Sequence, residues 1–389
     1  MIDIERIRLD TPSSQNILHF NSAGSSLMPI PVFDALQDVL RDENEIGGYE
    51  AERRAQDSIQ AFYTEFASLL NAEPDEIAYV ENATRAWDMA FYGLHLKSGD
   101  RVITHESEYA SNYLALLQQS RRLGFDIDLV PSDESGQIDV NALDNMIGPH
   151  TKLIAITHVP TQGGLVNPVA EVGKVARKHG VLYLLDACQS VGQIDVDVAE
   201  IGCDILSGTG RKFLRGPRGT GFLYVRKSIL DQIDPPFIDL LSAKWTEANR
   251  FEFIIGAKRF ENWESFVAGR VGLMEAVRYA RNIGLTNIET RVTQLAQDLR
   301  DALSQVKGVS VHDQGQKKCG IVTFKKDRID PGIMADTLRA DGINVSVSSL
   351  TSARLDLEPR NLKALVRASV HYFNTHDEIY RFVGAVEKA

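Results

Sequence analysis

Residues 204–225, DILSGTGRKFLRGPRGTGFLYV, decide the predicted fold and the search for a site. An apolar run at 205–206 leads into a loop rich in Gly, Thr and Arg, and a second apolar run follows at 221–225. This order predicts a strand, a loop and a second strand. The loop carries one lysine, Lys212, whose neighbours are able to bind an anion.

Lys212 has three interpretations. Lysines are mostly solvated surface residues. A nucleotide phosphate-binding loop needs Gly-Lys followed by Ser or Thr, whereas Lys212 stands between Arg211 and Phe213, and no Gly-x-Gly-x-x-Gly opens a first βαβ unit either. The third interpretation is a nucleophile that forms a Schiff base with a phosphorylated aldehyde, which suits a lysine in an organised, anion-binding loop.

The composition is that of an ordinary globular protein. The chain has 389 residues, of which 43% are hydrophobic and 24% charged, and its formal net charge is -11. An acidic chain argues against a nucleic-acid or anionic-membrane partner. A local basic group remains around Arg211, Lys212, Arg215 and Arg218, and we expect it to bind a small anion.

Cysteine usage and the N-terminal sequence indicate a cytoplasmic protein. Cys188, Cys203 and Cys319 occur singly, without metal-ligand spacing, so we expect no metal, a reducing compartment and buried apolar roles. The first 15 residues are charged and lack the apolar segment of a signal peptide. No apolar run approaches the length of a membrane span.

Short apolar runs alternate with amphipathic stretches of helical length. Strands that are apolar throughout are typical of a parallel sheet covered by helices on both faces. We therefore expect an α/β fold with a mostly parallel, seven-stranded type of sheet. Expected strands are 77–80, 101–104, 127–130, 153–157 and 181–185, and expected helices are 32–44, 59–70, 84–94, 109–123 and 169–178.

Ligands bind such sheets at the carboxyl ends of the strands. Thr84, Tyr109 and Asp186 each follow an expected strand. Each also has an ordinary interpretation: a helix cap for Thr84, packing for Tyr109, and a cap or ion-pair partner for Asp186. A ligand-binding role is favoured for all three because they share one end of the predicted sheet with Lys212.

Several motifs, in order and over nearly the whole chain, resemble the class V aminotransferase and cysteine desulfurase family of fold-type I enzymes that use pyridoxal 5′-phosphate (PLP). Within it, the chain looks closest to the isopenicillin N epimerase-like and C–S lyase branch. The motifs are residues 82–84, 108–109, 158–161, 186–189, 209–212, 216–221 and 367–369.

This resemblance implies roles around the cofactor ring. Lys212 would form the Schiff base with PLP and move protons at the substrate α-carbon. Asp186 would bond the pyridine nitrogen and keep it protonated. Tyr109 would stack on the ring where many relatives use histidine. Gln189 would bond the phenolic oxygen, with Thr161 nearby.

The resemblance also implies a phosphate site and a homodimer with shared active sites. Arg211 stands where the desulfurases have histidine, and arginine is a good phosphate ligand. Residues 255–264 resemble the segment that reaches the partner subunit's phosphate site. The implied phosphate-site residues are Ala83, Thr84, Thr209, Arg211 and, from that segment, Gly256.

Substrate binding and domain division follow from the same resemblance. Arg367 matches the arginine that holds a substrate α-carboxylate as a two-pronged pair. Asn21 opens a small-residue turn, 21–26, which could place backbone near the ligand or could be a plain surface turn. The expected large domain is 15–262; the small domain combines 1–14 with 263–389. Residues 344–356 are Ser-rich and should form a loop or loose strand pair near the site.

The expected function is class V aminotransferase-like amino-group transfer on a small α-amino acid. Alternatives are a β-eliminating C–S lyase of a cysteine conjugate and an amino-acid epimerase, because all three share the same first half-reaction. A PLP-fold protein without catalysis is disfavoured by the presence of Lys212, Asp186 and Arg367 together. A persulfide-forming cysteine desulfurase is also disfavoured, since 344–356 contain no cysteine.

Overall fold

The computed structural model describes residues 2–389 and is built around a seven-stranded sheet. Its strands are β2 (Ile77–Val80), β3 (Arg101–His105), β4 (Asp126–Val130), β5 (Thr151–Thr157), β6 (Leu182–Asp186), β7 (Ile205–Thr209) and β8 (Gly221–Val225). They lie in the order β2-β8-β7-β6-β5-β3-β4. All neighbours from β7 to β4 are parallel, whereas β8 is antiparallel to β7 and β2. The predicted α/β fold with a mostly parallel sheet is confirmed.

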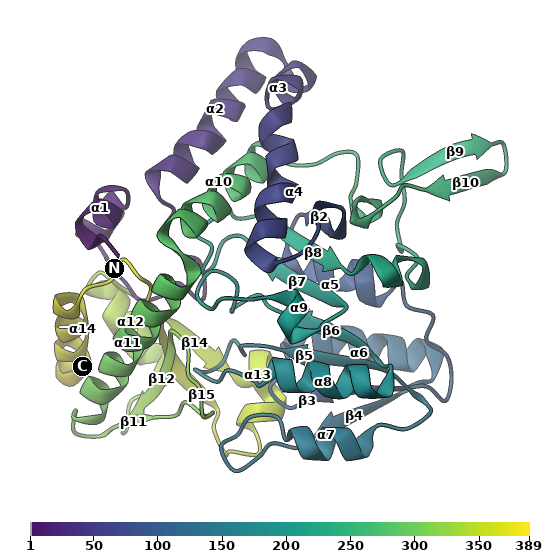
Figure 1. Cartoon of the computed structure of the whole chain (residues 1–389). Coiled ribbons are helices and arrows are strands. Elements are labelled where there is room, and N and C mark those ends of the chain that lie inside the picture. The colour runs from purple at the N-terminus through teal and green to yellow at the C-terminus, as the bar shows by residue number, and fades with distance from the viewer. Residues whose placement is uncertain (1) are drawn as a thin grey trace.

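Both faces of this sheet are apolar and covered by helices (Figure 1). On β5, Leu153 and Ala155 belong to one hydrophobic core and Ile154 and Ile156 to the other, because successive strand residues point to opposite faces. Helices α5 and α6 contribute to the first core, and α4, α7 and α8 to the second. Their bounds are α4 (Gln56–Leu70), α5 (Ala83–Phe91), α6 (Ala110–Leu123), α7 (Val140–Met146), α8 (Val169–His179) and α9 (Val198–Ile201).

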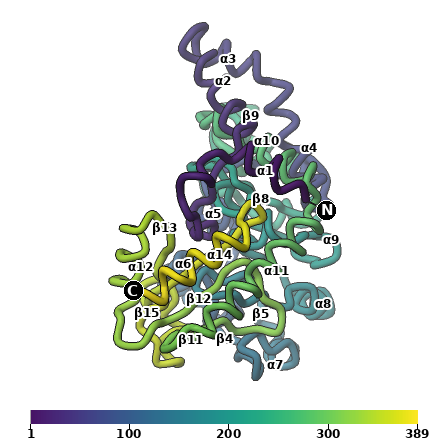
Figure 2. The backbone as a smooth tube through the Cα atoms, turned by 90° about the vertical axis from the view of Figure 1, so that its left-hand side faces the viewer, coloured from purple at the N-terminus to yellow at the C-terminus, as the bar shows by residue number. Residues whose placement is uncertain are grey.

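A separate hydrophobic core lies in the C-terminal part of the chain. Its antiparallel sheet has the order β11-β12-β15-β14, and Figure 2 shows α14 lying beside α11. Ile7, Leu18 and Phe20 from the N-terminal arm are buried in this core. The elements are β11 (Val309–Val311), β12 (Ile321–Lys326), β14 (Ser346–Ser349), β15 (Ala364–Ser369), α11 (Leu285–Ser304), α12 (Pro331–Ala340) and α14 (His376–Lys388). The domain boundaries stay a prediction.

The N-terminal arm reaches this core through a short strand pair. After α1 (Ile4–Leu9), β1 (Leu18–His19) pairs in parallel with β13 (Ile343–Asn344). The backbone continues this association, because the Ser369 N–H donates to the Phe20 oxygen at 2.8 Å. The two ends of the sequence are therefore held together in space.

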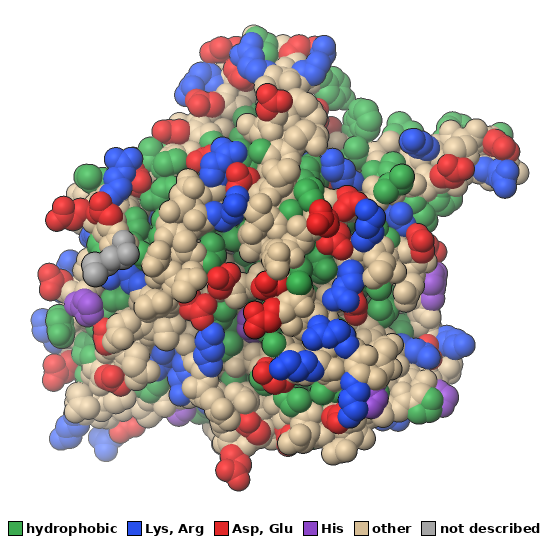
Figure 3. Space-filling model, in the orientation of Figure 1, with side chains coloured by type: hydrophobic (Ala, Val, Ile, Leu, Met, Phe, Trp, Pro, Cys, Tyr) green, Lys and Arg blue, Asp and Glu red, His purple; other side chains and the backbone are tan. Residues whose placement is uncertain are grey.

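Helix α10 (Val267–Ile283) packs against α2 (Ile30–Ile46) and α4, and α3 (Gly48–Arg54) follows α2. A hairpin of β9 (Ala243–Glu247) and β10 (Arg250–Phe253) projects from the body (Figure 1). Its Trp245 side chain is 74% exposed. On the face drawn in Figure 3, acidic and basic side chains are intermixed. Within residues 2–389, each helix is too short or too polar to cross a membrane.

The Ser-rich segment 344–356 is more ordered than expected. It forms β14 and then α13 (Leu350–Leu357), so the prediction of a loop or loose strand pair was wrong in its second half. Ser349 and Ser352 form a capping box at the start of α13. Serines favour helix N-termini because their hydroxyls satisfy free backbone N–H groups.

Candidate active site

A cavity of about 180 Å³ lies at the carboxyl ends of β6 and β7, where the sequence predicted a site. Parallel strands end at the same edge of the sheet, so residues that are distant in sequence meet there. The lining residues are Asn82, Ala83, Thr84, Tyr109, Asn112, Asp186, Cys188, Thr209, Arg211 and Lys212. Most of the predicted cofactor-binding residues are therefore brought together.

The Lys212 side chain is buried in this cavity, in the connection from β7 to β8. Its amine lies 3.5 Å from the Cys188 sulfur and 6.0 Å from the centre of the Tyr109 ring. Burial lowers the pKa of Lys212, and the nearby Arg211 lowers it further, while Asp186 opposes the shift. A lowered pKa favours the neutral, nucleophilic amine.

Asp186 is the last residue of β6, and each of its carboxylate oxygens accepts one hydrogen bond. Oδ1 accepts the Cys188 N–H at 2.9 Å, and Oδ2 accepts the Asn112 amide at 2.7 Å. Burial raises the pKa of Asp186, whereas these two hydrogen bonds lower it by stabilising the carboxylate. The carboxylate is thus held in one orientation at the cavity wall.

The N-terminus of α5 supplies an anion-binding edge. The Asn82 side chain caps the helix by accepting the Arg85 N–H at 2.9 Å, which leaves the amides at Ala83 and Thr84 without intrahelical acceptors. Thr209 also lines this edge, and its hydroxyl donates to the Thr220 oxygen.

Arg211 completes the basic part of the cavity. Its Nη1 donates to the Gly24 oxygen, so it ties the turn at 21–26 to the site. The turn is not a surface turn, since Ser22 and Ala23 are buried. The prediction of a wider basic group was wrong. Of its four residues, Arg211 and Lys212 line the cavity, whereas Arg215 is buried away from it and Arg218 is exposed.

Thr161, Gln189 and Arg367 form a hydrogen-bonded group close to the cavity. Arg367 Nη1 donates to the Thr161 oxygen at 2.9 Å and hydroxyl at 2.7 Å, and Gln189 Nε2 donates to the same hydroxyl at 3.1 Å. Arg367 Nε and Gln189 Oε1 are buried and have no hydrogen-bond partner among residues 2–389. Buried polar atoms are normally satisfied, so these two atoms indicate a place for a polar ligand.

Asn21 and Gly256, two further predicted site residues, are not among the residues that line the cavity. Asn21 pairs with Ser369 through a β-bridge, and its Oδ1 is buried without a partner. Gly256 does not line the cavity of its own chain; it packs against Asp75, with a φ of 86°. Its predicted role in a partner's site stays a prediction.

Three residues at the site were missed or misjudged. Cys188 lines the cavity beside Lys212, although we expected a buried apolar role. Asn112 and Glu108 form a buried hydrogen-bonded group with Asp186, which sequence reasoning had not assigned. Their four-residue spacing at the start of α6 was the available signal.

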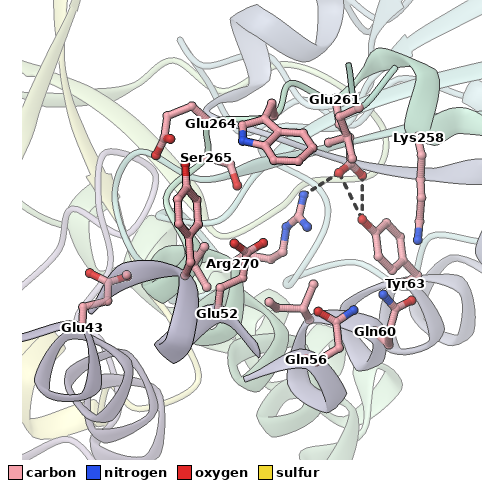
Figure 4. A pocket seen from close by; sticks show the side chains of 16 residues that line it. Glu43, Glu52, Gln56, Gln60, Tyr63, Lys258, Glu261, Glu264, Ser265 and Arg270 are labelled. Atoms are coloured by element: carbon pink, nitrogen blue, oxygen red, sulfur yellow. Dashed lines mark hydrogen bonds and ion pairs between the residues drawn. The ribbon is translucent and has the colours of Figure 1, made fainter. Parts of the chain in front are cut away.

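A larger cavity of about 540 Å³ lies away from Lys212, between α2–α4 and residues 258–270. Figure 4 shows Glu261 there between Arg270 and Tyr63, with hydrogen bonds of 2.5 and 2.9 Å. The Lys258 amine lies 3.8 Å from the centre of the Tyr63 ring. Glu261, Arg270 and Tyr63 bond one another, and Lys212 and Asp186 do not line this cavity within the described residues, so it is not the predicted cofactor site. Across the described residues, no three His, Cys, Asp or Glu side chains gather as a metal ion would require.

The fold and the lysine–carboxylate cavity define a fold-type I PLP-dependent enzyme, and comparisons with known proteins agree. The family model for class-V aminotransferases matches residues 18–382, so the chain belongs to this family. A probable cysteine desulfurase of Methanothermobacter thermautotrophicus is 30% identical over 381 residues, 96% of this chain and 95% of the relative. One from Halalkalibacterium halodurans is 30% identical over 96% of this chain and 93% of its own.

Solved structures show the same fold. The apo cysteine desulfurase from Thermococcus onnurineus NA1 has a TM-score of 0.92 and 26% identity, covering 100% of this chain and 98% of its own. The structure of C-DES with glycine covalently linked to its PLP cofactor has a TM-score of 0.89 and 23% identity, over 98% of each chain. The cofactor of this family, and of this chain, is PLP.

The residues of the cavity fit PLP. The free amides at the start of α5 suit a phosphate, the buried amine of Lys212 suits an aldehyde, and the Asp186 carboxylate suits a protonated ring nitrogen. The unpartnered Nε of Arg367 suits a substrate carboxylate.

The expected function was wrong. Aminotransferase or C–S lyase activity was preferred and desulfurase activity disfavoured, whereas the relatives and the Thermococcus structure are named cysteine desulfurases. The error has a chemical reason. A cysteine missing from 344–356 bears on which thiol attacks the substrate sulfur, and that thiol need not belong to this chain.

Proposed function

We propose that this chain is a PLP-dependent enzyme that removes sulfur from cysteine and leaves alanine. The observation that carries the proposal is the similarity, over almost the full length, to relatives named probable cysteine desulfurases. The site supports the proposal. The buried Lys212 and Asp186 are the groups that the cofactor needs, and the partly free Arg367 is the group that the substrate carboxylate needs.

Each residue acts on a different part of the substrate or cofactor. Bound PLP supplies an electron sink for the bonds at the substrate α-carbon. Lys212 holds the cofactor and carries the α-carbon proton, and Asp186 keeps the ring nitrogen protonated. Tyr109 lies against the ring. Arg367 binds the α-carboxylate and so fixes which bond at the α-carbon faces Lys212.

The phosphate and the phenolic oxygen occupy the two ends of the cavity. The start of α5 and the basic side of the β7–β8 loop bind the phosphate, and Gln189 and Thr161 lie near the phenolic oxygen. Asn21 lies beside the substrate. The phosphate ligands proposed are Ala83, Thr84, Thr209, Arg211 and, from a partner subunit's segment, Gly256.

We propose that the sulfur acceptor is a thiol in solution. The thiol sulfur attacks the substrate sulfur, an S–S bond forms, the Cβ–S bond breaks, and Cβ gains a proton; cysteine and thiol become alanine and a persulfide. Cys188 is a poor acceptor, because burial raises the pKa of its thiol and thiolates are the nucleophiles. No cysteine occurs within 344–356.

The test is product analysis. The holoenzyme is incubated with cysteine and dithiothreitol, and alanine, sulfide, pyruvate and ammonia are quantified. We expect alanine and sulfide in equal amounts, with sulfide depending on the added thiol. Pyruvate and ammonia in place of alanine would contradict the proposal.

The Lys212→Ala variant is the matched control for this chemistry. We expect it to lose the absorption band of the lysine-bound cofactor and all alanine formation, because no other amine lines the cavity within the described residues. Lys307→Ala, at an exposed lysine, should behave as the wild type. Normal turnover by Lys212→Ala would contradict the role proposed for Lys212.

A homodimer with shared active sites is part of the proposal. Ile255 is 84% exposed and Trp263 is 58% exposed, on the segment that carries Gly256. Large apolar side chains exposed together suit a protein interface. Sedimentation velocity should give the mass of two chains; a single-chain mass with full activity would contradict shared sites. The cytoplasmic location stays a prediction.

A further inference from the structure

Asp186 is held by Asn112, a side chain that is not among the proposed cofactor ligands. The Asn112 amide donates to Asp186 Oδ2 at 2.7 Å from the first turns of α6. The same nitrogen donates to Glu108 Oε1 at 2.9 Å. An amide nitrogen has two protons, so both are used, one on each carboxyl group.

Glu108 fixes this amide in turn. Its Oε1 also accepts the Tyr109 N–H at 2.8 Å and the Thr157 hydroxyl at 2.5 Å, and its Oε2 accepts the Thr104 hydroxyl at 3.1 Å. These bonds come from β3, β5 and the residue before α6, so Glu108 is anchored on three sides. The Asn112 amide can face both carboxyl groups only with its nitrogen, which sets its orientation.

The two carboxyl groups share one buried region and affect each other's charge. Burial, and after it the Asp186 charge, raise the pKa of Glu108 to about 7, although hydrogen bonds from Thr157 and Asn112 oppose the shift. Tyr183 on β6 also interacts with Glu108, and Lys212 lies beyond Asp186. Among residues 2–389, Glu108 has no ion-pair partner. Burial and the Asp186 charge favour its neutral form, whereas the hydrogen bonds that it accepts favour its carboxylate.

We propose that Asn112 and Glu108 are positioning residues for Asp186: Glu108 fixes the Asn112 amide, the amide fixes the carboxylate toward the cofactor ring nitrogen, and ionisation of Glu108 changes the charge beside Asp186. This inference rests on the role of Asp186 in the proposed function. It deepens that role, because it adds the groups that orient the carboxylate and change the charge beside it.

The first test is Asn112→Ala in the holoenzyme. Removing the amide leaves Asp186 Oδ2 without its donor and facing Glu108 directly. We expect kcat for alanine formation to fall by roughly tenfold to a hundredfold, as for a charge-assisted hydrogen bond, with a smaller change in KM. The pH midpoint at which the lysine-bound cofactor band changes should shift, which a purely structural loss would not cause.

Asn374→Ala is the matched control. Asn374 is buried and donates to Glu378 at 2.8 Å with the same four-residue spacing, but it lies in the C-terminal core. It should lose stability without moving the optical midpoint. An unchanged midpoint and kcat in Asn112→Ala would overturn the proposal.

The second test separates charge from position. Glu108→Gln keeps an acceptor for Asn112 and Tyr109 but cannot ionise. In the wild type we expect an absorbance step near pH 7, the Glu108 pKa, and its loss in Glu108→Gln. A step that persists in this variant would overturn the charge part of the proposal.

Asp186→Asn distinguishes the proposal from the function on which it rests. If Asp186→Asn abolishes turnover while Asn112→Ala behaves as the wild type, only the positioning role fails. If Asp186→Asn itself keeps normal turnover and spectrum, the role of Asp186 in the proposed function fails instead.

Discussion

Arg367 is buried but keeps one edge of its guanidinium free. Nη1 donates twice to Thr161, whereas Nε has no partner in the part of the chain that the structure describes. Burial lowers the pKa of Arg367 to about 10, and Arg211 contributes to the lowering. The free edge and the poorly solvated charge both favour binding of a carboxylate.

Arg367→Lys tests this binding role. Lysine keeps a charge but cannot form the two-pronged pair, so we expect KM for cysteine to rise by about tenfold or more, with a smaller fall in kcat. Steady-state kinetics measure both. Arg291→Lys is the control, because Arg291 also donates from two nitrogens, to the Tyr372 and Asn374 oxygens, outside the site. Equal KM values for the wild type and Arg367→Lys would contradict the role.

Glu108 makes the stability of the apoenzyme depend on pH. Its pKa rises from 4.5 in the unfolded chain to about 7 in the native structure, so the native state holds the proton more tightly. Stability from this group is complete below pH 4.5 and is lost as the pH rises through about 7. Glu108→Gln should flatten the free energy of unfolding between pH 5 and 7, as measured by urea denaturation. The same slope in the variant would show that Glu108 is not responsible.

At the level of elements, the main sheet and the loop between β7 and β8, which carries Lys212, were predictable from sequence. The apolar strands and the β7–loop–β8 unit have strong local signals, Asp186 ends β6, and Lys212 lies three residues after the end of β7. The contacts of Glu108 and Asn112 were not predictable, because they form between β3, β5, β6 and α6 only in the folded chain. The α13 helix was missed because a Ser-rich composition is shared by loops and helix caps.

The start of α5 depends on a close approach to β8 at Gly221. A Cβ at Gly221 would lie 2.7 Å from the Asn82 carbonyl carbon and 2.8 Å from the Gly208 oxygen. Both are backbone atoms, so they cannot move aside without shifting the helix N-terminus. The glycine therefore sets the distance between the sheet and the amides that we propose as phosphate ligands.

Gly221→Ala should weaken cofactor binding as well as stability. We expect the free energy of unfolding to fall by about 1–3 kcal/mol, as in overpacked cores, and the Kd for PLP to rise. Fluorescence titration with PLP and urea denaturation measure the two effects. Gly148→Ala is the control, since a Cβ there has no neighbour within 4 Å. An unchanged Kd for PLP in Gly221→Ala would show that the spacing is not needed.

On the scale of the whole molecule, Arg215 joins the loop between β7 and β8 to the rest of the chain. Its guanidinium is buried and donates to the Leu27 oxygen, the Tyr372 hydroxyl and the Thr11 hydroxyl at 2.8, 2.9 and 2.6 Å. It also lies 4.8 Å from the centre of the Phe373 ring. These partners come from both ends of the sequence, so one side chain connects three segments.

Arg215→Met should destabilise the protein more than any exposed arginine would. It removes the Arg215 donors from three oxygens, two of them in buried hydrogen bonds, so we expect a loss of at least about 3 kcal/mol in the free energy of unfolding. Arg218→Met, three residues further along at an exposed position, should change it by less than about 0.5 kcal/mol. Calorimetry of both variants decides, and equal unfolding temperatures would contradict the role of Arg215.

The pairing of β1 with β13 has a consequence during synthesis on the ribosome. Lys212, Asp186 and the start of α5 are all made by residue 225, and chains fold progressively from the N-terminus. However, β1 can pair only after β13 has been synthesised, and Asn21 can form its β-bridge only after Ser369 has been synthesised. The turn at 21–26, which touches Arg211, is therefore among the first segments translated and among the last to reach its place.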